Sequence, residues 1–322
     1  MAGGVPGLVT VAATADRASE RGAPRRASCV VVAFHRAEAL ARLVGALTDP
    51  QIEIVVVNVE DDPAVARVAK NCTVVPVTRN VGYGAAVNIG VRHVRSPFVV
   101  FMNDDVVVSS TSVLRLVDAV ADAADVAVPR VEDDDGDVIR TIAAVPTPAS
   151  LAREWLLLPD APVRVLRQLR VEKWREPQAP EPVSAASAMM VATSRSLLLD
   201  EPLPEDYFLY WEESEWFWRL QHRHTRVEYR PDAVCRHDGG RDDVRPEKSR
   251  LLARNAVRCV RRTQGRGPAL VAYAIVVAWN LRLALVDTVR ELLRPNDRAA
   301  SARARARRAG LGAAVVAARE IR

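Results

Sequence analysis

The stretch SCVVVAFHRAEALARLVGALTDPQIEIVVVN, residues 28–58, decides the fold. Its run CVVVAF (29–34) is rich in β-branched residues without interruption, which is typical of a strand buried on both faces. Leucine and valine then recur at helical spacing through 37–47, and IEIVVVN (52–58) is a second buried strand. A strand, a helix and a second strand in this order predict a parallel βαβ unit with a right-handed crossover.

The same alternation continues toward the middle of the chain and predicts an α/β sheet. The expected elements are a short helix over 62–70, a strand over 73–77, a helix over 83–94, a strand over 97–103 and a helix over 111–124. Ligands of such sheets bind at the carboxyl ends of the strands. The polar residues that follow the strands are His35, Asn58, Arg79, Asn80, Asn103, Asp104 and Asp105. We therefore expect the functional site at that edge.

Beyond residue 130 the alternation weakens. Residues 146–182 are rich in proline and are expected to form a loop-rich insertion, after which order returns with 183–192 and a helix over 212–222. Two further helices are expected over 248–263 and 268–293, and an Arg- and Ala-rich segment follows them.

Composition divides the chain into an acidic body and a basic tail. The 322 residues are 49% hydrophobic and 26% charged, which excludes collagen-like and wholly disordered proteins. The net charge of +5 combines −7 over residues 1–240 with +12 over residues 241–322. Four widely spaced cysteines without a CxxC pair disfavour a disulfide scaffold or a zinc ribbon and favour a reducing, cytosolic compartment.

The domain organisation follows from these patterns. Residues 1–27 lack the basic start of a secretion signal and are expected to be a disordered extension. Residues 28–240 form the expected α/β domain, and residues 241–322 a helical, basic tail. The longest uncharged apolar run of the tail, between Arg266 and Arg282, is shorter than the roughly 18 residues of a spanning helix, so no transmembrane segment is predicted.

Two segments after strands are candidate ligand sites. FMNDD (101–105) places Asp104 and Asp105 directly after a strand, where paired carboxylates suit a hard divalent cation shared with a diphosphate; a plain polar turn is the alternative. RNVGYGAAVNIG (79–90) places glycines where a strand leads into a helix, so that a ligand can approach the backbone and an anion the helix N-terminus. Its alternative is a glycine-rich cap.

The segment DYFLYWEESEWFWRL (206–220) is the strongest signal in the chain. Seven of the sixteen aromatic residues lie here among Glu212, Glu213 and Glu215. Aromatic faces bind sugars or prenyl groups, and apolar walls raise a carboxylate pKa toward values suited to a general base. An amphipathic helix with core aromatics and a solvated acidic face is the alternative. VCRHDGG (234–240) adds His237, which could complete a metal site of oxygen and imidazole ligands.

Taken together, these motifs resemble those of the family 2 glycosyltransferases, which are inverting enzymes of the GT-A fold, and most closely the rhamnosyltransferase-like branch. VVVAFHR (30–36) resembles the opening strand of that family, NVGYGAAVNIG (80–90) its NxGxGxxxNxG donor loop, and FMNDD its Asn-x-Asp. DYFLYWEESEW (206–216) resembles FFLYxEDxDL, and CRHDGG (235–240) the segment with the metal-binding histidine. The resemblance runs from about Cys29 to Gly240.

The resemblance implies a role for each matched residue. The metal, Mg²⁺ or Mn²⁺, falls to Asp105 and His237, and the catalytic base to Glu213, with Glu212 beside it. The residues implied in donor binding are His35, Asn58, Asn80, Gly82, Gly84, Asn88, Asn103 and Asp104. Acceptor binding falls to Trp211 and Tyr210.

Three positions depart from the family pattern. Asn58 stands where relatives have the base-contacting Asp, His35 stands where they have Asn, and Glu213 is longer than the usual Asp by one methylene group.

The implied reaction is a single displacement. Glu213 removes a proton from the acceptor hydroxyl, the oxygen attacks the anomeric carbon of a nucleotide-diphosphate sugar, and the metal stabilises the leaving diphosphate. The implied acceptor is a glycan or a polyprenyl-linked sugar of the cell envelope. The alternatives are a soluble transferase that decorates a small natural product and a catalytically weakened assembly subunit.

The basic tail predicts a location. An apolar helix over 268–293 followed by arginines is typical of an interfacial helix on an anionic membrane, which would place the protein in the cytoplasm on the inner face of the cell membrane. The alternative is a helix packed on the body or on a second copy of the chain in a homodimer. No nucleic-acid-binding module is recognisable, so no nucleic acid is expected as a partner.

Overall fold

The structure is a computed structural model that describes residues 25–143, 145–152, 177–237, 245–293 and 297–321. Most of the expected extension 1–27 and the central part of the expected insertion 146–182 lie outside these residues. The last residues of the extension belong to the folded body, which corrects the boundary at residue 28. Ala27 pairs with Ile52 in the sheet, and Arg25 forms a 2.9 Å ion pair with Glu53.

The first half of the sheet is parallel, as the sequence predicts. Strands β1 (Ala27–Ala33), β2 (Ile52–Val59), β3 (Thr73–Val77) and β4 (Phe98–Asn103) lie in the order β3-β2-β1-β4. The helices between and after them are α1 (Ala37–Ala46), α2 (Pro63–Val68), α3 (Tyr83–Val91) and α4 (Ser110–Asp122). The predicted strands and helices of this region are thus confirmed, with ends that differ by a few residues.

The second half of the sheet is mixed. Strand β11 (Met190–Ser194) runs antiparallel to β4 and to β6 (Val126–Glu132), and β12 (Val227–His237) runs parallel to β6. Strand β12 also pairs antiparallel with the short β5 (Val106–Val108), and this register sets His237 opposite Val106. The end of β12 is therefore brought beside the turn that follows β4.

Short elements connect these strands. The short strands are β7 (Val138–Ile139), β8 (Ile142–Ala143), β9 (Glu181–Pro182) and β10 (Ala185–Ala186), and the short helices are α5 (Pro148–Leu151) and α7 (Arg195–Asp200). Helix α8 (Glu212–His222) has the bounds that the sequence predicts.

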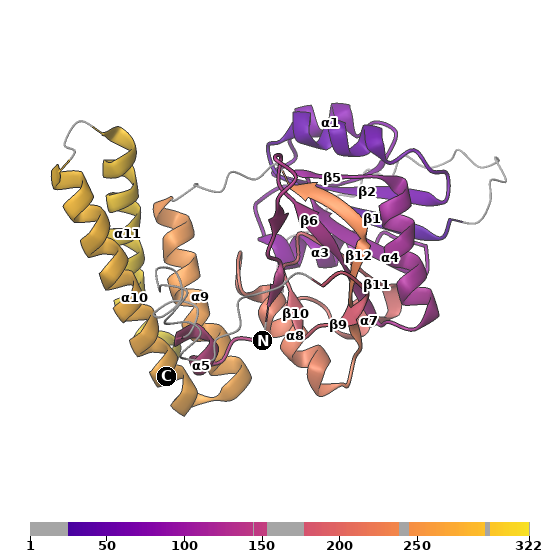
Figure 1. Ribbon diagram of the computed structural model, residues 1–322. Coiled ribbons are helices and arrows are strands. Elements are labelled where there is room, and N and C mark those ends of the chain that lie inside the picture. Colours follow the sequence, from indigo (N-terminus) through magenta and orange to yellow (C-terminus); the bar gives the residue numbers. More distant parts are fainter. Residues whose placement is uncertain (1–24, 144, 153–176, 238–244, 294–296, 322) are drawn as a thin grey trace, which may run out of the picture.

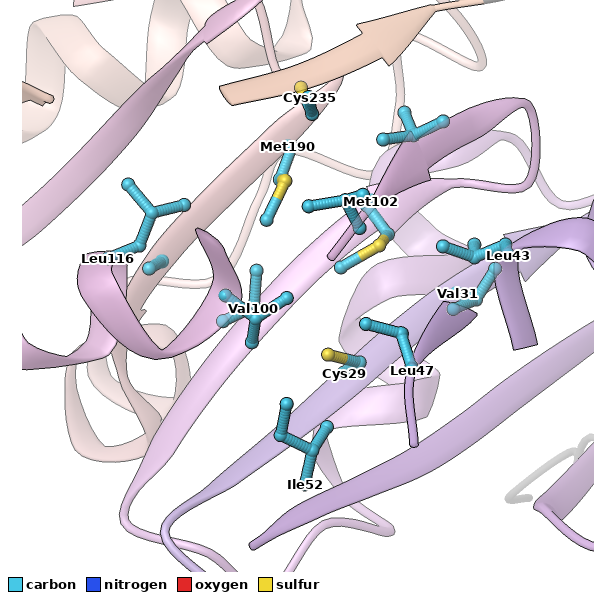
Figure 2. Close-up of a cluster of buried hydrophobic side chains, with 14 of the residues drawn as sticks. Cys29, Val31, Leu43, Leu47, Ile52, Val100, Met102, Leu116, Met190 and Cys235 are labelled. Atoms are coloured by element: carbon cyan, nitrogen blue, oxygen red, sulfur yellow. The ribbon is translucent and has the colours of Figure 1, made fainter. Parts of the chain in front are cut away.

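Two apolar cores cover the two faces of the sheet. On one face, α1 and α4 pack Leu43 and Leu116 against Cys29 and Val100 of the central strands (Figure 2). On the other face, α3 and α8 pack against the sheet, with Trp216 in edge contact with Phe101 at 5.9 Å. Burial on both faces explains why the sequences of the central strands are unbroken apolar runs.

The C-terminal region forms a layer of helices beside the sheet (Figure 1). It consists of α9 (Pro246–Gln264), α10 (Arg266–Leu293), α11 (Arg298–Val316) and the 3₁₀ helix η2 (Ala317–Ile321). An apolar cluster of its own joins them, with Ala256, Val260 and Val276 fully buried. Figure 1 shows α9 nearer the sheet than α10 and α11.

Helix α10 is longer than the uncharged run on which the prediction of no spanning segment rests. By length and composition alone it could cross a membrane, with a mean hydropathy of 2.0 in its most apolar window, of which 28% is buried. The prediction counted only the uncharged run, whereas a spanning window tolerates a flanking arginine. Length and composition are weak grounds, because a core helix passes the same test, and α10 packs on α9 and α11 along one side.

Candidate functional site

The charges of two carboxylate pairs act on the half-buried side chain of Tyr83. Asp104 and Asp105 follow β4, and Glu212 and Glu213 open α8. Burial raises the pKa of Tyr83 well above its ordinary value, and the negative charges of all four carboxylates raise it further. The Tyr83 hydroxyl donates a 2.8 Å hydrogen bond to the Ala188 carbonyl. The charges of segments separated by a hundred residues of chain therefore act on one phenol, which sequence reasoning had not singled out.

The turn after β4 is tied to the end of β1. Asp104 accepts a 2.9 Å hydrogen bond at Oδ2 from the Phe34 backbone N–H, and burial raises the pKa of Asp104 to about 6. Burial also acts to raise the pKa of Asp105, but the hydrogen bond and charge of His237 and the charge of Arg36 outweigh it, so that this pKa lies below its ordinary value. Asp105 is thus held as an anion.

The two residues implied as metal ligands come together. His237 Nε2 lies 3.3 Å from Asp105 Oδ1, while Arg36 contacts Oδ2 of the same carboxylate. Oδ1 is buried and, apart from this contact with His237, has no hydrogen-bond partner among the described residues. One carboxylate and one imidazole fit Mg²⁺ or Mn²⁺ as a partial ligand set. No group of three His, Cys, Asp or Glu side chains in the described ranges is placed to hold a metal, so a diphosphate and water would have to complete it.

The paired glutamates occupy an apolar position at the start of α8. Glu212 is buried and Glu213 half-buried, and the Oε2 atom of each has no hydrogen-bond partner in the described part of the chain. Burial raises the pKa of both, and the neighbouring charge of Glu213 raises that of Glu212 further. A carboxylate with a raised pKa and a free lone pair is suited to accept a proton from a hydroxyl group.

The aromatic segment does not form one binding surface. Tyr207, Trp216 and Phe217 belong to the core, as the alternative interpretation of an amphipathic helix has it. Tyr210 and Trp211, the expected acceptor residues, are only partly exposed, and Trp211 packs against the C-terminal helices. The segment therefore contains aromatic residues of the core and others that are partly exposed to solvent.

Glu215, the third glutamate of this segment, has a structural task. It accepts a 2.6 Å hydrogen bond from the Tyr207 hydroxyl and pairs with Arg262 at 2.9 Å. Its carboxylate is therefore occupied, unlike those of the pair before it.

Gly82 and Gly84 of the 79–90 segment admit protein backbone where a side chain would otherwise lie. Gly82 has φ +86°, and a Cβ there would lie 2.2 Å from the Phe208 carbonyl oxygen; at Gly84 it would lie 2.6 Å from that of Pro204. Asn80 Oδ1 accepts a 3.0 Å hydrogen bond from the Gly82 N–H and so shapes the turn. The segment is pressed against the 203–211 loop rather than left open.

Two of the expected donor-binding asparagines are engaged within the protein. Asn88 is buried and bonds the Leu203 N–H and carbonyl and the Glu205 carboxylate. Asn58 is fully buried, and its amide exchanges two 3.0 Å hydrogen bonds with the backbone of Asp62. Each side chain fixes a loop, so direct contact with a nucleotide is not supported for either.

The remaining donor-site candidates lie at the sheet edge. His35 is exposed and bridges Glu60 at 2.8 Å and Asp62 at 3.1 Å, contacts that raise its pKa, with the Glu60 hydrogen bond as the main cause. Asn103 is half-buried at the end of β4. Arg36 and Tyr83 also lie here; they stand inside the matched motifs VVVAFHR and NVGYGAAVNIG, but the sequence analysis assigned them no role.

A comparison with protein-family models bears on the function of this edge of the sheet. Residues 28–158 match the model of the family described as Glycosyl transferase family 2. No sequence among curated proteins matches the chain.

One solved structure shows the fold. The mannosyltransferase PcManGT from Pyrobaculum calidifontis, in complex with GDP-Man and Mn²⁺, has a TM-score of 0.50 and 15% sequence identity, with 93% of this chain and 90% of that one covered. TarS from S. aureus has a TM-score of 0.46 and 15% identity, with 84% and 73% covered. At this identity the first likeness shows the fold alone: an α/β sheet of the GT-A type with helices after it.

Proposed function

We propose that this chain is a nucleotide-sugar transferase of glycosyl transferase family 2 and that it works by single displacement with inversion. The match of residues 28–158 to the model of that family supports the proposal. The observation that carries the proposal is the 3.3 Å contact between Asp105 and His237 at the end of β4, with the charges of Asp104, Asp105, Glu212 and Glu213 all acting on Tyr83. One acidic pair lies at the carboxyl end of β4, where ligands of such sheets bind. The other has the raised pKa that a general base needs.

In this proposal each side chain has one task. Glu213 accepts the proton of the acceptor hydroxyl through its unpartnered Oε2, and its charge raises the pKa of the neighbouring Glu212. Asp105 and His237 hold Mg²⁺ or Mn²⁺, which when bound offsets the charge of the departing diphosphate. Phe34 fixes Asp104 through its backbone N–H. The Mn²⁺ bound to PcManGT supports the choice of metal.

The proposed donor is a nucleotide-diphosphate sugar, and the proposed acceptor a glycan or polyprenyl-linked sugar of the cell envelope. The rhamnosyltransferase-like branch rests on the motif resemblance. His35 and Asn103 are proposed donor contacts because they lie at the sheet edge, and Tyr210 and Trp211 are proposed acceptor contacts because they precede the glutamates.

A donor-hydrolysis assay tests the proposal. The full chain is incubated with Mn²⁺ and a panel of nucleotide sugars, and release of nucleoside diphosphate is measured. Asp105→Ala is expected to lower the rate at least a hundredfold, since each charge-stabilising group contributes about 10²–10³ in rate. The exposed Asp122→Ala on α4 is the matched control and should keep the wild-type rate. Equal rates for both variants would contradict the proposal.

We further propose that the outer side of α10 rests on an anionic membrane. Leu270, Leu281, Leu285, Val289 and Leu292 are 45–74% exposed and recur at helical spacing. The region 241–322 that carries them has a net charge of +12. An apolar helical face within a strongly basic region fits an acidic lipid surface, where each arginine near the headgroups contributes about 1 kcal/mol.

Vesicle flotation tests this location. The full chain should float with vesicles that contain phosphatidylglycerol and less with pure phosphatidylcholine. The double variant Leu285→Glu and Val289→Glu should stay in the soluble fraction, whereas Leu199→Glu on the body, also an exposed leucine, should float like the wild type. Flotation that the double variant does not reduce would contradict the proposal.

A further inference from the structure

The loop that leads into the paired glutamates is held from outside along its whole length. Arg258 Nη1 donates to the Asp206 carbonyl, and the Tyr83 N–H donates to the Phe208 carbonyl at 2.8 Å. Asn255 Nδ2 reaches the three remaining carbonyls, those of Tyr207, Leu209 and Tyr210, at 3.0, 2.9 and 3.2 Å. Five consecutive carbonyls thus accept hydrogen bonds from α3 or α9, and α9 supplies four of these contacts.

The backbone of this loop needs such support. Phe208, Tyr210 and Trp211 have φ of 68°, 68° and 77°, in the left-handed region that large side chains rarely adopt. Such a conformation is costly and persists only where its surroundings fix it. Trp211 is also the N-cap of α8, and no side-chain hydrogen bond caps the helix there. This backbone conformation sets the direction of Glu212 and Glu213. The loop would therefore not keep it without the contacts from α3 and α9.

Asn255 is built into its place. It is 1% exposed and lies on α9, a helix of the C-terminal layer. Two turns further along, Arg262 pairs with Glu215 and with Asp206, on either side of the loop. Glu320 of η2 in turn holds Arg258 at 2.8 Å. The amide is thus the centre of a contact between the C-terminal layer and the loop before the glutamates.

We propose that Asn255 is a positioning residue for the proton-accepting glutamates, so that the C-terminal layer is part of the catalytic unit. The proposal rests on the proposed function for its kinetic consequence, and on the loop geometry for the rest. When Asn255 releases the loop, the left-handed residues relax, water reaches the first turn of α8, and Glu213 loses both its direction and the apolar surroundings that raise its pKa.

The test compares Asn255→Ala with Thr263→Val in the full chain. Thr263 is buried on the same helix, but its hydroxyl bonds only the Cys259 carbonyl within α9, so its variant reports on helix packing alone. Asn255→Ala is expected to lower kcat at least tenfold, which corresponds to about 1.4 kcal/mol, with the KM for the donor unchanged and the acid limb of the kcat profile moved to lower pH. Thr263→Val should change none of these.

Hydrogen exchange gives a readout that needs no activity. Amides of 207–213 should exchange faster in Asn255→Ala, while those of β1 and β4 keep their protection; Thr263→Val should leave the loop as in the wild type. If Asn255→Ala does not fold, Arg262→Gln replaces it, because this partly exposed arginine can be removed with little cost to the core, and it should show the same changes to a smaller extent.

The outcomes separate the two proposals. Unchanged loop exchange in a folded Asn255→Ala or Arg262→Gln overturns the positioning role, whatever the activity. A fall in kcat without a shift of the acid limb also overturns it, because loss of stability alone leaves the pKa of Glu213 as it is. A wild-type chain that turns over no nucleotide sugar refutes the proposed function, while loop exchange still decides on Asn255.

Discussion

Glu212 and Glu213 are neighbours whose environments oppose the ionised state. Both lie in apolar surroundings with an oxygen that lacks a partner among the described residues, and burial raises the pKa of each. A solvent-exposed glutamate has a pKa of about 4.3. Burial of the two carboxylates therefore costs stability and makes each of them a stronger base.

This arrangement predicts the pH dependence. In the proposed mechanism Glu213 acts in its ionised form, so kcat falls as the pH drops through its raised pKa, and the acid limb should lie above that of an exposed glutamate. Burial, and not the charge of Glu212, raises the pKa of Glu213, so Glu212→Gln should leave the limb where it is. A kcat profile of both proteins measures this. A limb that moves to lower pH in Glu212→Gln would contradict burial as the cause.

The same burial predicts that function and stability oppose each other at Glu213. A folded-state pKa above the unfolded value means that ionisation destabilises the fold at any pH above that raised pKa. Glu213→Gln should therefore raise Tm at neutral pH while it lowers kcat at least a hundredfold. Glu215→Gln is the contrasting variant: its carboxylate holds Tyr207 and Arg262, so Tm should fall. Differential scanning calorimetry gives both values.

At the scale of elements, α3 and the loop before α8 are fitted to each other. Gly82 at φ +86° lets the Phe208 carbonyl approach closely enough to accept the Tyr83 N–H. Gly90 does the same for Val30 of β1, whose Cγ1 would lie 2.4 Å from an added Cβ. These glycines belong to contacts between elements, not to an open ligand pocket.

Gly82→Ala is expected to destabilise the protein by more than 1 kcal/mol, since it combines a positive φ with a Cβ 2.2 Å from a backbone oxygen. Gly312→Ala is the matched control. Gly312 lies in α11 with nothing within 4 Å of an added Cβ, so this change should stabilise the helix by roughly 0.5–1 kcal/mol. Urea denaturation of both variants measures the difference. A Gly82 variant as stable as the wild type would show that the loop contact contributes little.

The comparison of sequence with structure has a physical reason at this scale. Apolar periodicity fixed the elements 27–122, because local burial determines both the pattern and the fold. The sequence also indicated that Asp105 and His237 share a site, and the pairing of β12 with β5 brings them together. It could not tell which atoms approach Gly82, because that neighbour lies more than a hundred residues away in the chain.

For the whole molecule, the helical layer is an integral part of the fold. The sequence predicted a tail separate from the body in its task, since the charge changes sign near residue 240. The structure instead places Asn255 and Arg262 of α9 against the loop 206–211 and Glu215. A single buried amide among apolar positions of a helix was the signal for this contact, and its partner could not be predicted from local pattern.

Truncation tests this view of the molecule. A chain that ends at residue 245 loses four of the five contacts to the loop carbonyls 206–210 and exposes Tyr207. It should have a lower Tm than the full chain and no transferase activity, even on a water-soluble acceptor. A truncated chain with wild-type Tm and kcat would show that the helical layer serves only to bind the membrane.

Three buried cysteines allow local opening of the structure to be measured by alkylation. Cys29, Cys235 and Cys259 are buried free thiols, and burial raises the pKa of Cys29 and of Cys235 to about 12 and that of Cys259 also upward. Thiolate is the reactive form, so the closed protein resists alkylation at these positions. Cys259 lies one turn from Asn255 on the helix that holds the glutamate loop. Its rate of alkylation therefore measures how often that helix leaves the loop, in the unmodified chain and without any substrate.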